Sequence, residues 1–464
     1  MIREYVEAHR SYFESGVTRQ VPVRQTALKR LKRVLLDMED EILQALSSDF
    51  GKPRFEGYIG ELAVIHEELD HTLKHLEEWA RPEGAGRSIA TLMNSAAVHK
   101  EPLGVVLIIV PFNYPVQLAL VPLISAVAAG NTVVIKMSSL TPGAGRVLKK
   151  VIQRSFRPGH CGLIEGGEGI NDEVMAQRYD KILFTGGREV GLTVARKAAE
   201  TLTPVMLELA GRNPVIVLRD ADVVMAARSI AWGRFFNAGQ TCIAPNHVYV
   251  HRQIRTAFLE EMKLAIHEFY GDDPSQSPDF GRIISDESFD RLKGLLAGDI
   301  EIQAGGQARA EDRYIAPTLV TGVPKSHPLL ASEIFGPILP ILEYSDINGL
   351  IRELREGETP LASYVFSQDA GFAQKVMARI PSAGSCINET MLHVASPLLP
   401  FGGTGASGNG IYHGRYGFEA FTHLRAVLTG HANLSAGMVH PPYSSLKENS
   451  VRGFLRARSS RRTS

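Results

Sequence analysis

Cys242 lies in a polar turn that is unusual for a structural cysteine. Residues 237–245 read N-A-G-Q-T-C-I-A-P, so small and amide residues lead to the thiol at the end of a helical stretch. A buried structural cysteine prefers an apolar run, such as the one beside Ile387 that holds Cys386. A thiolate attacks aldehydes readily, and the resulting thiohemiacetal can lose a hydride. The segment therefore predicts a nucleophilic cysteine.

Two further polar side chains stand at predicted strand ends. Glu208 lies between leucines, where burial would raise the carboxyl pKa toward that of a general base; the alternative is a satisfied structural carboxylate. Asn113, in P-F-N-Y-P at residues 111–115, can donate its amide to an oxyanion or cap the following helix. Hydrolysis of a thioester requires both a base and an oxyanion donor.

Two glycine-rich segments are candidates for a nucleotide site. Residues 184–191 read F-T-G-G-R-E-V-G, in which a buried strand ends in two glycines and opens into a helix. A helix N-terminus offers free N–H groups to an anion, although an ordinary tight turn has the same pattern. Residues 403–408 fit G-x-G-x-x-G, but no strand–helix–strand unit follows them. Of the two, residues 184–191 are therefore the better candidate for the nucleotide site.

Strands and helices alternate along the first half of the chain. Residues 105–110, 132–136, 162–165, 181–185 and 205–209 form apolar runs typical of strands buried on both faces. Helical patterns lie between them, and residues 1–80 are amphipathic helices. The pattern predicts an α/β fold with a doubly wound parallel sheet that binds nucleotides at the carboxyl ends of its strands.

The remaining chain divides into a second α/β block and more extended segments. We expect a cofactor domain from residues 1–80 and 104–208, and a catalytic α/β domain from residues 209–411. Residues 81–103 and 412–440 look extended and form a predicted small β arm. Residues 441–464 hold several arginines and are predicted to be a solvated, flexible tail.

The composition excludes several classes of protein. Lysine plus arginine equals aspartate plus glutamate at 50 each, so no net charge attracts nucleic acid. The apolar runs are too short to span a membrane, and the first ten residues do not resemble a secretion signal. Three scattered cysteines indicate a reducing, cytoplasmic setting. His71 and His75 lack a third ligand, so no metal site is expected.

Nine segments, in order along almost the whole chain, resemble the aldehyde dehydrogenase superfamily, and most closely its class-3-like branch of fatty and aromatic aldehyde dehydrogenases. They are residues 101–105 (E-P-L-G-V), 113–115 (N-Y-P), 134–136 (V-I-K), 184–186 (F-T-G), 203–209 (T-P-V-M-L-E-L), 239–242 (G-Q-T-C), 333–337 (E-I-F-G-P), 401–403 (F-G-G) and 412–414 (Y-H-G). The resemblance implies NAD(P)-dependent oxidation of an aldehyde to a carboxylic acid. It also implies a homodimer held together by the β arm.

The resemblance assigns catalytic roles to three residues. Cys242 would be the nucleophile that forms the thiohemiacetal and thioester, with hydride passing to the nicotinamide. Glu208 would activate the hydrolytic water. Asn113, with the main-chain N–H of Cys242, would form the oxyanion hole.

The resemblance also assigns cofactor-binding roles. Lys136 would bind the adenosine ribose, and Glu333 the nicotinamide ribose, with Phe335 packed near the nicotinamide. The pyrophosphate-facing turn would comprise Gly186, Gly187, Arg188, Val190 and Gly191.

Ser139 departs from the family pattern at the ribose site. The family often has Lys-Pro-Ser-Glu where this chain has K-M-S-S at residues 136–139. A glutamate would repel a 2′-phosphate, so its absence predicts that NADP is tolerated or preferred beside NAD.

The resemblance also suggests a substrate pocket. Its side chains would be Tyr58, Tyr114, Leu118, Trp232, Phe236 and His413. They are mainly apolar and aromatic, which favours a medium-chain aliphatic or aromatic aldehyde.

Two alternatives stay open at this point. A CoA-acylating aldehyde dehydrogenase would pass the acyl group to CoA, but that branch typically lacks the base that Glu208 would supply. A catalytically silent protein could also have this fold, although it would have no need of Cys242, Glu208 and Asn113 together.

Overall fold

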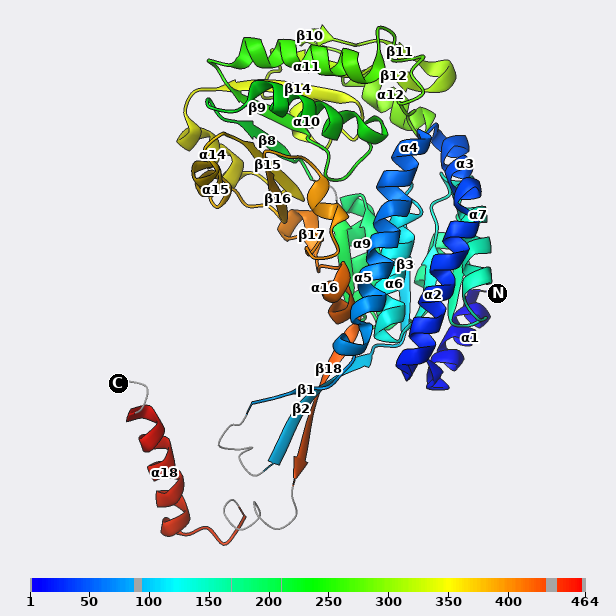
Figure 1. The fold of residues 1–464 in the computed structure, drawn as a ribbon, viewed down its shortest axis with the longest axis vertical. Helices are drawn as coiled ribbons and strands as arrows, with labels where there is room; N and C mark the ends of the chain where they lie inside the picture. Colours follow the sequence, from blue (N-terminus) through cyan, green and yellow to red (C-terminus); the bar gives the residue numbers. More distant parts are fainter. Residues whose placement is uncertain (1, 87–93, 168, 210, 431–439, 461–464) are drawn as a thin grey trace. The chain divides into compact units, whose positions relative to one another are not determined.

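The computed structural model describes residues 2–86, 94–167, 169–209, 211–430 and 440–460. The chain divides into two compact units (Figure 1). The first contains Met1–Trp79 and Pro102–Thr422, and the second contains Ala80–Glu101 and His423–Ser464. The predicted cofactor and catalytic domains both belong to the first unit.

The chain begins with helices that supply one side of the first unit. They are α1 (Ile2–Glu14), α2 (Val21–Asp37), α3 (Glu39–Phe50), α4 (Arg54–Gly57), a π-helical turn η2 (Tyr58–Leu62) and α5 (Ala63–Trp79). Leu28, Leu31 and Leu35 recur at three- and four-residue steps in α2 and are fully buried. The amphipathic pattern predicted for this region is therefore confirmed.

A six-stranded sheet forms the cofactor half, in the order β17-β7-β6-β3-β4-β5. Its strands are β3 (Val105–Ile109), β4 (Thr132–Lys136), β5 (Cys161–Ile164), β6 (Lys181–Gly186), β7 (Val205–Leu209) and β17 (Gly408–Asn409). All neighbours are parallel except β17, which runs antiparallel to β7. The strand order reverses at β3, as the prediction of a doubly wound sheet requires.

Helices cover both faces of this sheet. α6 (Gln117–Ala129) and α7 (Pro142–Ser155) pack on one face, against β3, β4 and β5. α1, α8 (Ile170–Met175) and α9 (Arg188–Ala199) pack on the other. Val105 and Leu107 point into the core shared with α1, α8 and α9, and Val106, between them, points to the opposite face. Burial of both faces explains the continuous apolar runs in the sequence.

The catalytic half contains a seven-stranded sheet in the order β10-β13-β14-β9-β8-β15-β16. Its strands are β8 (Pro214–Val217), β9 (His247–His251), β10 (Glu301–Ala304), β13 (Thr318–Thr321), β14 (Ile338–Tyr344), β15 (Ala362–Phe366) and β16 (Gly384–Ile387). Figure 1 shows α10 (Val223–Phe235) and α11 (Arg255–Tyr270) on one face, with α14 (Ile347–Glu356) and α15 (Ala370–Met377) on the other. Shorter elements complete this half: α12 (Asp286–Gly294), α13 (Pro328–Ala331), β11 (Ala308–Arg309) and β12 (Tyr314–Ile315).

The second unit contains a three-stranded sheet in the order β1-β2-β18. Its strands are β1 (Glu83–Gly84), β2 (Asn94–Pro102) and β18 (Thr422–Gly430). Residues 87–93 and 431–439 of the predicted arm, and residues 461–464 of the predicted tail, lie outside the described residues. Helix α18 (Ser445–Ser460) occupies much of the stretch for which we expected no regular structure.

The predicted start of the second arm segment needs correction. Residues 412–421 were expected to be extended and to belong to the arm, but they belong to the first unit and contain helix α16 (Gly414–Ala420). Gly417 fits closely against Ser125, and the Phe418 ring packs 5.8 Å from Trp79. Burial against α5 and α6 favours the helix over an extended segment.

No helix in the described ranges is long and apolar enough to cross a membrane.

Candidate active site

The predicted functional residues of the cofactor half gather at the carboxyl edge of its sheet. Lys136 ends β4 and pairs with Ile109 at the end of β3. Thr185 on β6 pairs with Glu208 on β7. Because parallel strands end at a common edge, the turns after β3, β4 and β6 lie together with Glu208.

The nucleophile loop follows α10 with three residues in left-handed conformation. Asn237, Ala238 and Gly239 have φ values of 55°, 51° and 75°. Two of them are not glycine, so surrounding contacts must hold them in this conformation. A Cβ on Gly239 would overlap the carbonyl of Gly336, so the nucleophile loop is in direct contact with the loop that carries Phe335.

Side-chain hydrogen bonds fix this loop from several directions. The main-chain N–H of Asn237 donates to Glu56 (2.8 Å), and its amide donates to the carbonyl of Asn113 (3.1 Å). The Gln240 side chain donates to the carbonyls of Asn237 (3.1 Å) and Arg282 (3.0 Å). The polar turn in the sequence is thus a rigid support for Cys242.

Cys242 is partly buried, and its main chain is held in place. Its main-chain carbonyl accepts a hydrogen bond of 2.8 Å from the amide of Asn213. Burial raises the pKa of the Cys242 thiol well above its ordinary value, and the nearby carboxylates of Glu208 and Glu333 raise it further. At neutral pH the cysteine is therefore a thiol, which requires a base before it can attack.

Glu208 is a buried carboxyl with 2% of its surface exposed. Burial raises its pKa to about 7, and the Cys242 and Thr185 side chains lie close enough to lower it partly. Neither carboxyl oxygen completes a hydrogen bond with the described part of the chain. Such a group can exchange protons at neutral pH and has no structural partner to hold it.

The turn that carries Asn113 is also fully anchored. The carbonyl of Asn113 accepts from the ammonium of Lys52 (2.9 Å) as well as from Asn237. Val116 is the N-cap of α6, and no side chain of its own caps the helix. The carboxylate of Glu61 caps it instead, accepting from the N–H groups of Val116 (2.7 Å) and Gln117 (3.0 Å). The helix-capping alternative for Asn113 is therefore excluded.

An apolar cavity of about 150 Å³ opens beside Cys242. Four of the six predicted pocket residues line it, namely Tyr114, Leu118, Trp232 and Phe236. The other lining residues are Ile59, Gly60, Val64, Gln117, Thr241, Ile243, Met391, Leu392, Val394, Ala395 and Phe401. The Tyr114 hydroxyl is 2.6 Å from Thr241 Oγ1, which orients the ring at the cavity wall.

Two predicted pocket residues lie outside this cavity. Tyr58 is 39% exposed, because the π-helical turn presents Ile59 and Gly60 to the cavity instead. His413 is buried behind the wall, with its ring 5.5 Å from Phe401 and 4.7 Å from Tyr412. Its burial lowers the imidazole pKa to about 3, so His413 is a neutral packing residue.

The predicted pyrophosphate turn is open to an anion. α9 begins at Arg188 after the N-cap Gly187, and no side chain among the described residues caps it. Gly187, Arg188 and Val190 are exposed, whereas Gly191 is buried against Leu209. The Arg188 guanidinium pairs with Glu358, so in this structure its charge is already partnered.

The remaining predicted cofactor residues surround the same edge. Lys136 is 8% exposed, and its ammonium has no hydrogen bond or ion pair with the described residues. Ser139 is exposed beyond it. Burial raises the pKa of Glu333 to about 8, and its Oε1 is buried without a partner. Phe335 packs edge-on to Phe112 at 5.8 Å.

These residues fit a dinucleotide. An uncapped helix N-terminus suits a pyrophosphate, while the unpartnered groups of Lys136 and Glu333 suit ribose hydroxyls.

By contrast, the glycines of residues 403–408 allow close packing of the main chain. A Cβ on Gly403 or Gly408 would overlap the carbonyl of Ser407 or Leu207, so these glycines accommodate protein backbone rather than phosphate.

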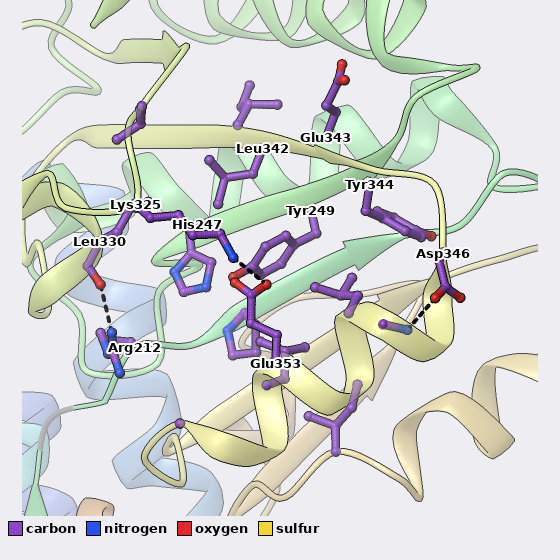
Figure 2. A pocket seen from close by; sticks show the side chains of 18 of the residues that line it. Arg212, His247, Tyr249, Lys325, Leu330, Leu342, Glu343, Tyr344, Asp346 and Glu353 are labelled. Atoms are coloured by element: carbon purple, nitrogen blue, oxygen red, sulfur yellow. Dashed lines mark hydrogen bonds and ion pairs between the residues drawn. The ribbon is translucent and has the colours of Figure 1, made fainter. Parts of the chain in front are cut away.

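A larger cavity of about 680 Å³ lies on the catalytic sheet beside α14 (Figure 2). His247 and Tyr249 of β9 form part of its floor, and a Lys325–Glu353 ion pair of 2.9 Å crosses it. It shares no lining residue with the Cys242 cavity, and none of the predicted site residues lines it. The chemistry around Cys242 therefore belongs to the smaller, apolar cavity.

The model of the aldehyde dehydrogenase family matches residues 1–427. The chain belongs to this family. Among curated proteins, this aldehyde dehydrogenase is 39% identical to 4,4′-diaponeurosporen-aldehyde dehydrogenase of Staphylococcus aureus, over 94% of this chain and 95% of that one. It is 40% identical to human aldehyde dehydrogenase family 3 member B1 (94% and 93%), and 39% identical to the dimeric NADP-preferring aldehyde dehydrogenase of Rattus norvegicus (92% and 94%).

Solved structures give the same result. A substrate-bound structure of Staphylococcus aureus AldH superposes with a TM-score of 0.95 at 37% identity, covering 98% of this chain and 99% of that one. An NAD⁺ complex of a Bacillus cereus aldehyde dehydrogenase has a TM-score of 0.85 at 25% identity (92% and 88%). The predicted superfamily, its class-3-like branch, the α/β fold, the enzyme class and the use of NAD or NADP are thereby confirmed.

Sequence reasoning missed several residues that support the site. Lys52, Glu56 and Glu61 act from the first helices, and Gly60 forms part of the cavity wall. Arg234 is 1% exposed. It donates to the carbonyls of Pro245 and Gly336, and these two hydrogen bonds tie the nucleophile loop to the loop that carries Phe335. The G-K-P run at residues 51–53 breaks a helical pattern and was the one available signal for Lys52.

Proposed function

We propose that this aldehyde dehydrogenase oxidises an apolar aldehyde to its carboxylic acid through covalent intermediates on Cys242. The observation that carries the proposal is the unpartnered, buried carboxyl of Glu208, with a pKa of about 7, beside the Cys242 thiol. Glu208 takes the thiol proton, and Cys242 Sγ bonds to the aldehyde carbon to form a thiohemiacetal.

The oxyanion on the former aldehyde oxygen accepts hydrogen bonds from the Asn113 amide and the main-chain N–H of Cys242. A bound NAD or NADP supplies the hydride acceptor. Loss of hydride from the thiohemiacetal carbon leaves a thioester on Cys242. Glu208 releases the thiol proton to solvent and then removes a proton from water as that water attacks the thioester. The carboxylic acid leaves, and Glu208 returns the proton to the sulfur of Cys242, which restores the thiol.

Hydrolysis rather than transfer to CoA follows from the position of Glu208. A carboxylate with a pKa near 7 beside the thioester activates water directly. The CoA-acylating alternative has no comparable support among the described residues.

The cavity indicates the class of aldehyde. Its walls are almost entirely apolar and aromatic, and no charged side chain lines it. A medium-chain aliphatic or aromatic aldehyde therefore fits best. The Staphylococcus aureus relative, whose name specifies 4,4′-diaponeurosporen-aldehyde, supports an apolar substrate.

We extend the proposal to cofactor preference and assembly. Ser139 places no carboxylate near Lys136, so NADP is accepted beside NAD or preferred to it, as the name of the rat relative states for that protein. A homodimer formed through the β arm rests on the same relative, which is named dimeric. A reducing, cytoplasmic setting rests on Cys161, Cys242 and Cys386, which are all free thiols.

A direct test measures reduction of NAD and NADP separately, with a panel of aldehydes and without CoA. Turnover with apolar aldehydes that is lost in Cys242→Ala supports the proposal. Turnover that requires CoA would replace hydrolysis by acyl transfer.

A further inference from the structure

The loop between α3 and α4 and the π-helical turn η2 place a buried ion pair beside the Asn113 turn. The side chains of Lys52 and Glu61 are both fully buried, and Lys52 Nζ lies 2.7 Å from Glu61 Oε1. The proposed function uses neither residue. Burying an ion pair costs free energy unless further hydrogen bonds use its remaining donors and acceptors, so its other contacts indicate its role.

The remaining contacts of Lys52 are with residues of the Asn113 turn. Its ammonium donates to the carbonyl of Asn113 (2.9 Å) and lies 4.1 Å above the centre of the Tyr114 ring. An ammonium has three N–H groups, and the carboxylate, the carbonyl and the ring account for them. Burial lowers the pKa of Lys52, and Glu61 partly offsets this effect.

Glu61 anchors the chain on the other side of Asn113. Its second oxygen accepts from the N–H groups of Val116 (2.7 Å) and Gln117 (3.0 Å) at the start of α6. The Lys52–Glu61 pair therefore fixes the main chain both at residue 113 and three residues beyond it. A turn held at both ends has little freedom to rotate.

The same carbonyl links this turn to the nucleophile loop. The Asn113 carbonyl also accepts from the Asn237 amide (3.1 Å), and the N–H of Asn237 is held by Glu56. The carbonyl thus connects the loop leading to Cys242 with the buried pair. Displacement of Lys52 would remove one of two donors that hold Asn113.

We propose that Lys52, supported by Glu61, is a positioning residue that holds the main chain of Asn113 so that its amide meets the oxygen of the substrate on Cys242. This inference rests on the proposed function, in which Asn113 is the oxyanion donor. Lys52 itself touches no reacting atom.

A variant that keeps side-chain length but removes the ammonium tests the proposal. Lys52→Met is expected to lower kcat roughly tenfold to a hundredfold, with the KM for NAD unchanged, because a small displacement of a reacting group has effects of this size. Lys181→Met is the matched control, since Lys181 also donates to a carbonyl, that of Ala420 (2.8 Å), away from Cys242. The control should lose thermal stability but keep kcat.

A double-variant cycle distinguishes positioning from general damage. If Lys52 acts through Asn113, Lys52→Met combined with Asn113→Ala should be no slower than Asn113→Ala alone. Losses that multiply independently would overturn the proposal. Unchanged kcat in Asn113→Ala alone would instead remove Asn113 from the proposed function, which is a separate failure.

Two further measurements keep the test decisive. The alkylation rate of Cys242 by iodoacetamide, followed on its peptide, should be the same in Lys52→Met and in the parent; a slower rate would overturn the proposal by placing the defect in the nucleophile loop. If Lys52→Met does not fold, Glu61→Gln retains the volume and should give a smaller loss of kcat that also vanishes in the Asn113→Ala background. A loss that persists there would overturn the proposal.

Discussion

Two turns at the carboxyl edge of the same sheet differ in how their polar groups are used. In the turn after β3, the Asn113 carbonyl has two donors, the Tyr114 hydroxyl meets Thr241, and Glu61 accepts from the first N–H groups of α6. In the turn after β6, α9 has no side-chain cap within the described ranges, and Val190 is 57% exposed. One turn is closed by protein contacts, and the other is left open.

The difference corresponds to what each turn must hold. The turn after β3 faces an intermediate bound covalently to Cys242, where fixed geometry lowers the barrier. The turn after β6 must bind and release a dinucleotide, which supplies the missing partners itself. We call the turn after β3, with the nucleophile loop and the cavity beside it, the closed region. The turn after β6, with the predicted ribose-binding residues at the same sheet edge, is the open region. Changes at the closed region should lower kcat or the use of the aldehyde, and changes at the open region should alter the KM for the dinucleotide.

The largest effect is expected from Cys242→Ala. Without the thiol no covalent intermediate forms, so kcat should fall by at least about 10³-fold. The rate of dinucleotide reduction measures this. Cys386→Ala is the matched control, because Cys386 contacts His393 (3.2 Å) outside the cavity and should keep turnover. Normal turnover in Cys242→Ala would refute the covalent mechanism.

Glu208→Gln should slow both proton transfers that the proposed mechanism assigns to Glu208, from the thiol and from water. Steady-state turnover is expected to fall about 10²–10⁴-fold, the range for loss of a general base. If the thiol still reacts, a burst of reduced dinucleotide close to one equivalent per site precedes the slow phase. Glu68→Gln is the control: the Glu68 carboxyl also has a pKa raised to about 7 by burial, but it accepts from Gly414. If Glu68→Gln lowered turnover as much as Glu208→Gln, the loss would not show that Glu208 is the base.

The pH dependence of kcat should report the same carboxyl. Because burial raises the pKa of Glu208 to about 7, it is protonated below that pH and cannot accept a proton from water. The rate of deacylation should therefore fall about tenfold for each pH unit below 7 and level off above it. Single-turnover hydrolysis of the thioester measures this limb directly. If the rate still fell below pH 7 in Glu208→Gln, the titration would belong to another group.

Gly60→Ala should narrow the aldehyde cavity in the closed region without altering the reacting groups. A Cβ at residue 60 would lie 3.1 Å from Phe236 and 3.2 Å from Tyr114, so it takes up space at the cavity wall and both rings must give way by a few tenths of an ångström. The kcat/KM for an aromatic aldehyde should fall about tenfold relative to that for a short aliphatic one. Gly294→Ala, where an added Cβ meets open space, serves as the control. Equal losses for both aldehydes would remove Gly60 from substrate selection.

The smallest effect should come from the open region. Ser139→Glu introduces a carboxylate near the proposed ribose site, which repels a 2′-phosphate. The KM for NADP should rise about tenfold more than the KM for NAD, a difference of about 1.4 kcal/mol, while kcat stays the same. A fall in kcat would contradict the division between the closed and open regions. Equal changes in both KM values would refute the assignment of Ser139.

The sequence was most informative where local pattern and structure agree. The apolar runs of residues 105–110 and 132–136 predict buried strands, and β3 and β4 fall within one residue of them. Glu208 and Asn113 were identified at the ends of such strands, and Cys242 at the end of a helical stretch. The rule that parallel strands share a carboxyl edge was enough to bring Glu208 and Asn113 to one edge.

Features that depend on distant contacts could not be predicted in this way. Lys52 lies 61 positions from Asn113, and a buried lysine looks the same in a sequence as an exposed one. Tyr58 was misplaced because the π-helical turn η2 changes which side chains face the cavity, and no local composition reveals such a turn. The segment that became α16 was misjudged because its helix depends on packing against α5 and α6.

The short strand β17 makes the cofactor half depend on a segment that follows the catalytic sheet in the chain. Gly408 and Asn409 come after the whole catalytic sheet in the chain, yet they pair with Leu207 and Glu208 at the margin of the cofactor sheet. Any fragment that ended before residue 408 would leave β7 with bare N–H and C=O groups, a surface prone to aggregation. The two halves of the first unit should therefore unfold in one cooperative transition, and neither should be recoverable as a stable fragment.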